Sequence, residues 1–288
     1  MSRYFVRFVL RLLALWPALI AGAAVHVEHL EPPFWWAGME SSRLELMVHG
    51  ERIAELEPSI DYPGVSIENV YRTGNPNYLF VELQLADDVA AGEFSINFLR
   101  AGEARLRHRY ALRARDPGSA ARKGCDASDV IYLITPDRFA NGDLSNDRAK
   151  SLREGPDRDD AHGRHGGDLQ GIIDRLDYIA DMGYTQIWLN PVMENDQPEY
   201  SYHGYATTDF YQVDARFGSN ALYKKLAAEA RKKGIGLIID LIPNHSGSKH
   251  WWMSDPPSGD WINHGGQFVG TSHKRESLFD PNAAEADR

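Results

Sequence analysis

Hydrophobic and polar positions alternate along the first third of the chain in a pattern typical of β-strands. Between residues 25 and 115 the alternation, with many β-branched and aromatic residues, recurs in six short stretches: 26–30, 43–48, 65–71, 78–85, 94–99 and 106–112. A period of two residues indicates strands with one buried face, and Gly, Pro and Asn clusters between the stretches indicate turns. This spacing predicts an immunoglobulin-like β-sandwich over residues 25–115.

The pattern changes after a polar, small-residue stretch at 116–128, which we interpret as a linker. Apolar runs then alternate with amphipathic segments. The runs are 130–135, 185–190 and 235–242, and the segments 169–182 and 220–233 are followed by Gly183 and Gly234. Continuous apolar runs predict parallel strands buried on both faces, and the segments between them predict helices that end at glycine.

Long polar loops follow each predicted strand, as they do at the active-site face of a (β/α)₈ barrel. A doubly wound sheet is the alternative, but no glycine-rich phosphate loop follows the first strand. We therefore predict a multidomain β + α/β protein. An N-terminal immunoglobulin-like sandwich precedes the first part, about three strands, of a (β/α)₈ TIM barrel over residues 129–288.

The first 24 residues have the pattern of a secretory signal peptide. Arg3, Arg7 and Arg11 precede an apolar core at 12–20, and small residues follow at 21–24. A membrane anchor is the alternative, but the apolar run is shorter than the ~20 residues that a membrane span requires. We expect a mature protein that is secreted, either periplasmic or extracellular, with no membrane partner after cleavage.

Charge and cysteine content narrow the range of partners. The formal net charge of −10 disfavours nucleic acid as a partner. The chain has one cysteine, Cys125, so no disulfide can form within it.

One loop is rich in the oxygen ligands that calcium prefers. Asn141, Asp143, Asn146 and Asp147 place four oxygen-bearing side chains within seven residues. The spacing is not that of an EF-hand, and a turn rich in Asn and Asp is the alternative interpretation.

Candidate sugar-binding residues follow the second and third predicted strands. Tyr202, His203 and Tyr205 can stack on a sugar ring or hydrogen-bond its hydroxyls, although an aromatic-rich loop can equally serve packing. Asp240 ends an apolar strand, where a carboxylate requires a partner. Pairing with an arginine is the structural alternative to a role in the site.

Five segments in order resemble the α-amylase superfamily, most closely its neopullulanase and cyclomaltodextrinase branch. They are IYLITPDRFANGDLSND, GRHGGDLQGI, GYTQIWLNPVMEN, YHGYATTDFYQVDARFGS and GIGLIIDLIPNHSG, and the final LFDPNAAEADR is also similar to that branch. The resemblance covers residues 129–288, and the preceding β domain resembles the N-terminal domain of the same enzymes. It implies a glycoside hydrolase that acts on α-1,4-glucans such as maltodextrin, cyclodextrin or pullulan.

The resemblance also implies roles for individual positions. The resemblance assigns substrate binding to four residues: His203, Tyr205, Asp240 and His245. It implies calcium as the cofactor, with six ligand residues: Asn141, Asp143, Asn146, Asp147, Gly166 (through its carbonyl) and Asp168.

The mechanism that the resemblance implies is retaining hydrolysis by two carboxylates ~5–5.5 Å apart. It places the nucleophile and the acid/base beyond Arg288, and the G-x-R-x-D segment that would carry the nucleophile does not occur in the sequence. We therefore expect the chain to be C-terminally truncated and inactive as given. A non-catalytic glucan-binding protein and a transglycosidase of the same superfamily are the alternatives. The resemblance also makes a homodimer an alternative to a monomer.

Overall fold

The computed structural model describes residues 26–267 and 269. The predicted signal peptide and the final LFDPNAAEADR segment lie outside these residues. The chain divides into two compact units, with the boundary between Arg115 and Asp116. Within the described residues, no helix is long and apolar enough to cross a membrane.

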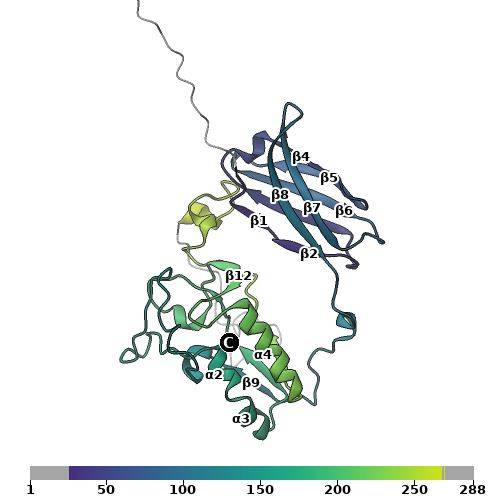
Figure 1. The fold of residues 1–288 in the computed structure, drawn as a ribbon. Helices are drawn as coiled ribbons and strands as arrows, with labels where there is room; N and C mark the ends of the chain where they lie inside the picture. Colours follow the sequence, from purple (N-terminus) through teal and green to yellow (C-terminus); the bar gives the residue numbers. More distant parts are fainter. Residues whose placement is uncertain (1–25, 268, 270–288) are drawn as a thin grey trace, which may run out of the picture. The chain divides into compact units, whose positions relative to one another are not determined.

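The first unit contains two four-stranded sheets (Figure 1). One has the order β1-β3-β6-β5, built from β1 (His29–Glu31), β3 (Arg43–His49), β6 (Tyr78–Leu85) and β5 (Val65–Arg72). The other has the order β2-β8-β7-β4, built from β2 (Phe34–Trp36), β8 (Glu103–Arg113), β7 (Gly92–Arg100) and β4 (Glu57–Ile60). A 3₁₀ turn at Ile53–Glu55 precedes β4. The predicted N-terminal β domain is confirmed.

Alternation along the strands creates the core of this unit. Leu46, Val81 and Leu83 of one sheet and Ile96 and Phe98 of the other are fully buried in one apolar cluster. The residues between them in the sequence point outward, as the period of two requires. The core therefore follows directly from the alternation in the sequence.

Two strands of the sandwich escaped prediction, and each has a local reason. β4 contains Pro58, which lacks an N–H for the strand ladder and is tolerated because β4 is an edge strand. β2 comes directly after Pro32 and Pro33 and pairs in parallel with β8 over only three residues. Such a short strand has too few positions to display a period.

The second unit contains a three-stranded parallel sheet in the order β13-β10-β9. The strands are β9 (Ile131–Ile134), β10 (Gln186–Leu189) and β13 (Gly236–Ile239). Strands that are neighbours in the sheet are also successive strands of the β-α-β-α-β pattern along the chain, as the first strands of a barrel are. This arrangement, a partial catalytic domain, confirms the predicted fold class.

Short helices and turns connect these strands. The helices are α1 (Pro136–Phe139), α2 (Leu169–Ile173), α3 (Leu176–Asp181) and α4 (Asn220–Lys232). A hairpin pairs β11 (Met193–Glu194) with β12 (Asp209–Val213). The 3₁₀ turns are Ser119–Ala121, Ser201–His203, Trp251–Met253 and Asn263–Gly266.

Two expectations for this unit were wrong. The predicted helix at 169–182 is two helices, because Arg175 leaves the helical region with a ψ of 12°. The strands are also not buried on both faces. Ile131, Leu133 and Ile239 are exposed, while Ile134, Ile187 and Leu189 are buried against the helices. The described residues cover only one face of this sheet, and the apolar runs alone could not reveal that.

Candidate functional site

Side chains predicted to bind substrate meet at the carboxyl ends of β10 and β13. Asp240 directly follows β13, and one of its oxygens, Oδ2, accepts hydrogen bonds from the Tyr205 hydroxyl at 3.0 Å and from Trp188 Nε1 at 3.3 Å. No arginine is its partner in these bonds. Burial, followed by the hydrogen bond to Asp240, raises the pKa of Tyr205, so the phenol stays protonated and able to donate.

Tyr205 also links the two histidines. Its backbone N–H donates to His203 Nδ1 at 2.9 Å, and its carbonyl contacts His245 Nε2 at 2.8 Å. The remaining nitrogen of His245 contacts the Asn244 side-chain amide at 3.2 Å, so the protein engages both ring nitrogens of His245. The structure therefore brings together all four predicted substrate-binding residues, with Tyr205 in contact with each of the other three.

His203 keeps one ring nitrogen for a ligand. Because Nδ1 accepts from Tyr205, the neutral ring carries its proton on Nε2, for which no hydrogen bond is found among the described residues. Burial lowers the pKa of His203, against a smaller opposing effect of Glu154, and so favours the neutral ring. A neutral imidazole N–H can donate to a sugar hydroxyl, and a carboxylate such as that of Asp240 can accept from one.

Two glycines, Gly204 and Gly247, hold the loops of this site in place. Gly204 has a φ of +83°, and a Cβ at this position would collide with the carbonyl of Pro191, just after β10. Gly247 donates to the Thr207 carbonyl at 2.7 Å, and a Cβ there would collide with the carbonyl of Ala206. The loop after β13 is thereby fixed against the loop that carries Tyr205.

A buried ion pair that sequence reasoning missed supports the same region. Arg216 donates to both carboxylate oxygens of Asp214 and to the backbone carbonyls of Glu154 and Asn195. Burial opposes ionisation of Asp214, but the hydrogen bonds and charge of Arg216, aided by the charge of Arg164, hold its pKa below the usual range. The two residues of this pair are two positions apart in the sequence, and no periodic pattern identifies such a pair.

Most of the predicted calcium ligands also lie together. Asn141 donates to Asp147 at 2.6 Å, Asn146 donates to Asp168 at 3.0 Å, and Gly166 packs directly against Asn141 and Asp147. The buried side-chain oxygens of Asn141 and Asn146 have no hydrogen-bond partner. Buried polar atoms without partners are rare and require an explanation such as an ion or water.

Asp143 and Asp168 have other roles in this arrangement. The Asp143 side chain accepts from the N–H and hydroxyl of Ser145. The Asp168 carboxylate accepts four hydrogen bonds, from the N–H groups of Gly142, Asp143 and Gly171 and from the Asn146 amide, and it caps α2. Across residues 26–267 and 269, no three His, Cys, Asp or Glu side chains are grouped to hold a metal. The donor set is mainly amide and carbonyl oxygen, which suits a hard cation.

Family models match both units of the chain. Residues 133–282 match the model of the alpha-amylase catalytic domain, and residues 29–116 match that of the cyclomaltodextrinase N-terminal domain. The chain belongs to the alpha-amylase family. The expected resemblance, including the neopullulanase and cyclomaltodextrinase branch, is confirmed.

The relatives of this alpha-amylase family member are longer proteins. A beta/alpha-amylase of Paenibacillus polymyxa is 41% identical over 143 residues, which are 48% of this chain and 12% of the relative. Neopullulanase 2 of Thermoactinomyces vulgaris is 38% identical over 127 residues, 44% of this chain and 21% of the relative. An Anoxybacillus alpha-amylase of known structure is 45% identical with a TM-score of 0.41, covering 44% of this chain and 26% of that one. The chain thus spans about a quarter or less of each of these relatives.

Proposed function

We propose that the chain supplies the sugar-binding part of an α-1,4-glucan hydrolase, at the subsite that holds the glucose unit being cleaved. The observation that carries this proposal is the hydrogen bond from the Tyr205 hydroxyl to Asp240, at the carboxyl end of a parallel strand. The Tyr205 backbone N–H also donates to His203 Nδ1, which leaves His203 Nε2 available as a donor. Membership of the alpha-amylase family supports it, and relatives named neopullulanase, cyclomaltodextrinase and amylopullulanase suggest maltodextrin, cyclodextrin or pullulan as substrates.

Each residue has a distinct part in this proposal. Asp240 accepts from sugar hydroxyls, His203 donates from Nε2, and the Tyr205 ring offers an apolar face for stacking. His245 holds Tyr205 through its carbonyl and so acts as a positioning residue. Cleavage itself follows the retaining two-carboxylate mechanism in the complete enzyme, and this chain binds and orients the sugar.

Binding of maltohexaose, measured by isothermal titration calorimetry, tests the proposal. Tyr205→Phe removes the bond to Asp240 but keeps the ring, and losing one such bond should weaken binding roughly fivefold to tenfold. Tyr178→Phe, on the exposed side of α3, is the matched control and should leave the affinity unchanged. Saturable binding that is identical in both variants would contradict the proposal, as would no binding by the parent chain.

We also propose calcium for the loop at 141–147. The unpartnered oxygens of Asn141 and Asn146, with the carboxylate of Asp147 and the nearby backbone of Gly166, fit a hard cation. Bound calcium would supply charge that holds this loop against the segment at 163–168. Asp143 and Asp168 support the site through the loop hydrogen bonds described above.

Thermal unfolding with calcium and with a chelator tests this site. Calcium at about a hundred times its dissociation constant should stabilise the fold by ~2.7 kcal/mol, and Asn146→Ala should remove most of that gain. Asn69→Ala in the sandwich is the control, because its amide bonds only Glu82. Equal calcium stabilisation in all three proteins would refute the proposed ligands.

Secretion is a further part of the proposal. The signal-like pattern at residues 1–24 supports export to the periplasm or the medium. N-terminal sequencing of the protein recovered from each cell fraction checks it. A mature protein that begins near residue 25 is expected, and an uncleaved cytoplasmic chain would contradict export.

A further inference from the structure

Three polar groups of Ser201 are bound by side chains from three other segments of the chain. Its N–H donates to Glu154 Oε2 at 2.7 Å, its hydroxyl accepts from Arg164 Nη1 at 3.1 Å, and its carbonyl accepts from Asn195 Nδ2 at 3.2 Å. Ser201 is fully buried, and it begins the 3₁₀ turn that ends at His203. The bonds to Ser201 therefore affect where the ring of His203 lies.

The backbone is in the left-handed region on both sides of this turn. Tyr200, before the turn, has a φ of +61°, and Gly204, after it, has a φ of +83°. Glycine adopts this region without strain, but a tyrosine does so only where its surroundings hold the backbone in place. The buried hydrogen bonds of Ser201, the next residue, supply such a constraint.

One buried carboxylate, that of Asp137, connects two arginines that contact the turn. Asp137 lies in α1, with Oδ2 at 2.8 Å from Arg138 Nη1 and Oδ1 at 3.8 Å from Arg164 Nε. Arg164 reaches the Ser201 hydroxyl, and the Arg138 guanidinium lies over the Tyr202 ring, 4.0 Å from its centroid. Asp137 thus connects the turn to the segment that follows β9, the first strand of the parallel sheet.

Glu154 contributes both a hydrogen bond and a charge. Its backbone carbonyl accepts from Arg216 Nη1 at 2.8 Å, which fixes the residue, and its side chain accepts from the Ser201 N–H. Burial lowers the pKa of His203, and the negative charge of Glu154 opposes that effect. One side chain therefore holds the backbone of the turn and also influences the protonation of its histidine.

We propose that four charged side chains, together called the turn clamp, are positioning residues that direct His203 Nε2 towards the bound sugar. They are Asp137, Arg138, Glu154 and Arg164. The inference rests on the proposed function, because a sugar is the ligand that His203 would meet. The clamp fixes the backbone of the turn, and the Tyr205 N–H then fixes the ring through Nδ1. The donor is in place before the sugar arrives, so binding requires little further ordering.

Replacing Glu154 separates its hydrogen bond from its charge. Glu154→Gln keeps a carbonyl oxygen as acceptor for the Ser201 N–H, whereas Glu154→Ala removes it. Isothermal titration calorimetry with maltohexaose should show about fivefold weaker binding for Glu154→Ala, and Glu154→Gln should recover most of that loss.

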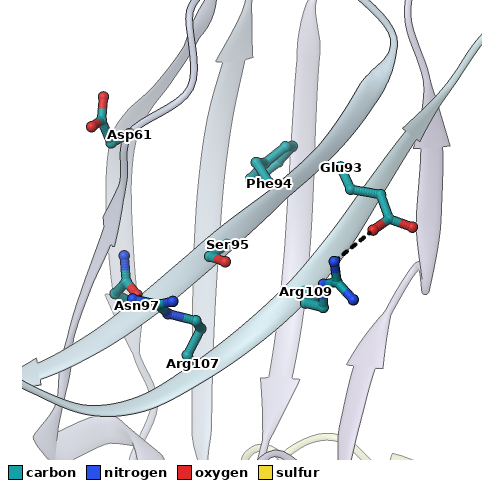
Figure 2. Close-up of a pocket in the computed structure, with 7 residues that line it drawn as sticks. All are labelled: Asp61, Glu93, Phe94, Ser95, Asn97, Arg107 and Arg109. Carbon is teal, nitrogen blue, oxygen red and sulfur yellow. Dashed lines mark hydrogen bonds and ion pairs between the residues drawn. The ribbon is translucent and has the colours of Figure 1, made fainter.

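The matched control removes a carboxylate that has no part in the clamp. Figure 2 shows Glu93, which pairs with Arg109 at 3.4 Å on the outer face of the sandwich. Both side chains are largely exposed, so water screens the pair and its loss costs little. Glu93→Ala should therefore leave the affinity for maltohexaose unchanged.

Nitrogen-15 NMR of the histidine rings gives a readout that general destabilisation would not change. In the parent chain Nδ1 of His203 accepts from the Tyr205 N–H, so the neutral ring should be the single Nε2–H tautomer. In Glu154→Ala the released turn should give a mixture of tautomers. Glu154→Gln should keep the single tautomer and lower the pKa of His203, because the opposing negative charge is gone.

Arg138→Lys is the second variant, and it carries the test if Glu154→Ala does not fold. Lysine keeps a positive charge beside Asp137 but lacks the planar fork that bonds Asp137 and the Ala161 carbonyl while facing the Tyr202 ring. We expect weaker maltohexaose binding and a mixture of His203 tautomers. Parent-like affinity with a single tautomer in both variants would overturn the clamp, and weaker binding with a single tautomer would overturn its effect on the ring.

The two readouts separate failure of the clamp from failure of the proposed function. No maltohexaose binding by the parent chain would contradict the proposed function, and the tautomers would still report whether the clamp holds His203. If Tyr205→Phe weakens binding while Glu154→Ala matches the parent chain in affinity and tautomer, the clamp alone is contradicted.

Discussion

The two units bury polar groups to very different extents. In the part of the chain that the structure describes, the sandwich buries a single polar residue, His49, whereas the barrel unit buries ten. Those ten are Asp137, Arg164, Asp168, Asn195, Ser201, Thr207, Thr208, Asp214, Arg216 and His250. Most of them lie in the segments that follow the parallel strands, the same segments that carry the residues proposed to bind sugar.

This difference indicates two ways of holding a protein segment in place. The sandwich places its strands through the burial of apolar area, which is non-directional and tolerates many arrangements of outer side chains. The loops of the barrel unit carry few apolar residues, so directional hydrogen bonds and ion pairs must fix them. A site that aims individual atoms at a ligand benefits from the second kind of support.

Breaking the Asp214–Arg216 pair should have the largest effect. Arg216→Met leaves a buried carboxylate without its partner and should cost about 3–5 kcal/mol of unfolding free energy in the barrel unit. Arg43→Met, which removes an exposed arginine from its pair with Glu82 in the sandwich, is the control and should cost less than about 1 kcal/mol. Urea denaturation measures both, and similar losses would contradict the contrast between the units.

Truncating a side chain in the apolar core should lower the unfolding free energy of the sandwich nearly as much. Leu46 is fully buried, and Leu46→Ala should cost roughly 2–5 kcal/mol because it removes buried surface and leaves a cavity. Leu144, in the oxygen-rich loop at 141–147 of the other unit, is 74% exposed, so Leu144→Ala should change stability by less than about 0.5 kcal/mol. The same denaturation curves report both values, and a costly Leu144→Ala would show that the loop has its own apolar support.

Adding a methyl group to Gly204 should have a smaller effect on stability and a clear effect on binding. Gly204→Ala strains a positive φ and drives the new methyl into the Pro191 carbonyl, at a cost of about 1–3 kcal/mol. Gly102, in the β7–β8 turn, has nearly the same φ of +82° but open space around it. Gly102→Ala therefore isolates the conformational cost, and calorimetry with maltohexaose should show weaker binding only for Gly204→Ala.

The smallest effect should come from two partly buried histidines, one in each unit. Burial lowers the pKa of both His108 and His203 below the unfolded value of 6.5. The unfolded chain therefore takes up protons first, and stability should decline as pH falls from about 6.5 towards the folded pKa. Replacing either residue by Gln should flatten that decline in denaturation curves between pH 7 and 5. A steeper decline in either variant would reverse the assigned sign.

Sequence patterns anticipated most of the elements and named residues that the structure brings together in the proposed sugar site. Alternation located β3, β5 and β6, and the position of Asp240 at a strand end marked it as a site residue. The hydrogen-bond partners of Asp240 were harder to predict from the sequence. Trp188 contacts it because β10 pairs in register with β13, and register depends on the whole sheet.

The remaining features depend on contacts that no local pattern encodes. The place of β2 at a sheet edge depends on parallel pairing of its three residues with residues 111–113, which lie far along the chain. The four donors to Asp168 come from two segments more than 20 residues apart. The spacing of Asn and Asp residues could propose the oxygen-rich loop. It could not show which of its oxygens already accept hydrogen bonds from the protein.

The contact of Gly247 with the Tyr205 loop has a kinetic consequence. Since the Gly247 amide is bonded to Thr207, and no side chain separates the two backbones, neither loop can open without the other. Their amides should exchange with deuterium as one cooperative group, at a rate set by a single opening event. A sugar that touches only Tyr205 would then slow exchange across the segment at 244–250 as well, so protection at Gly247 reports occupancy of a site it does not itself contact.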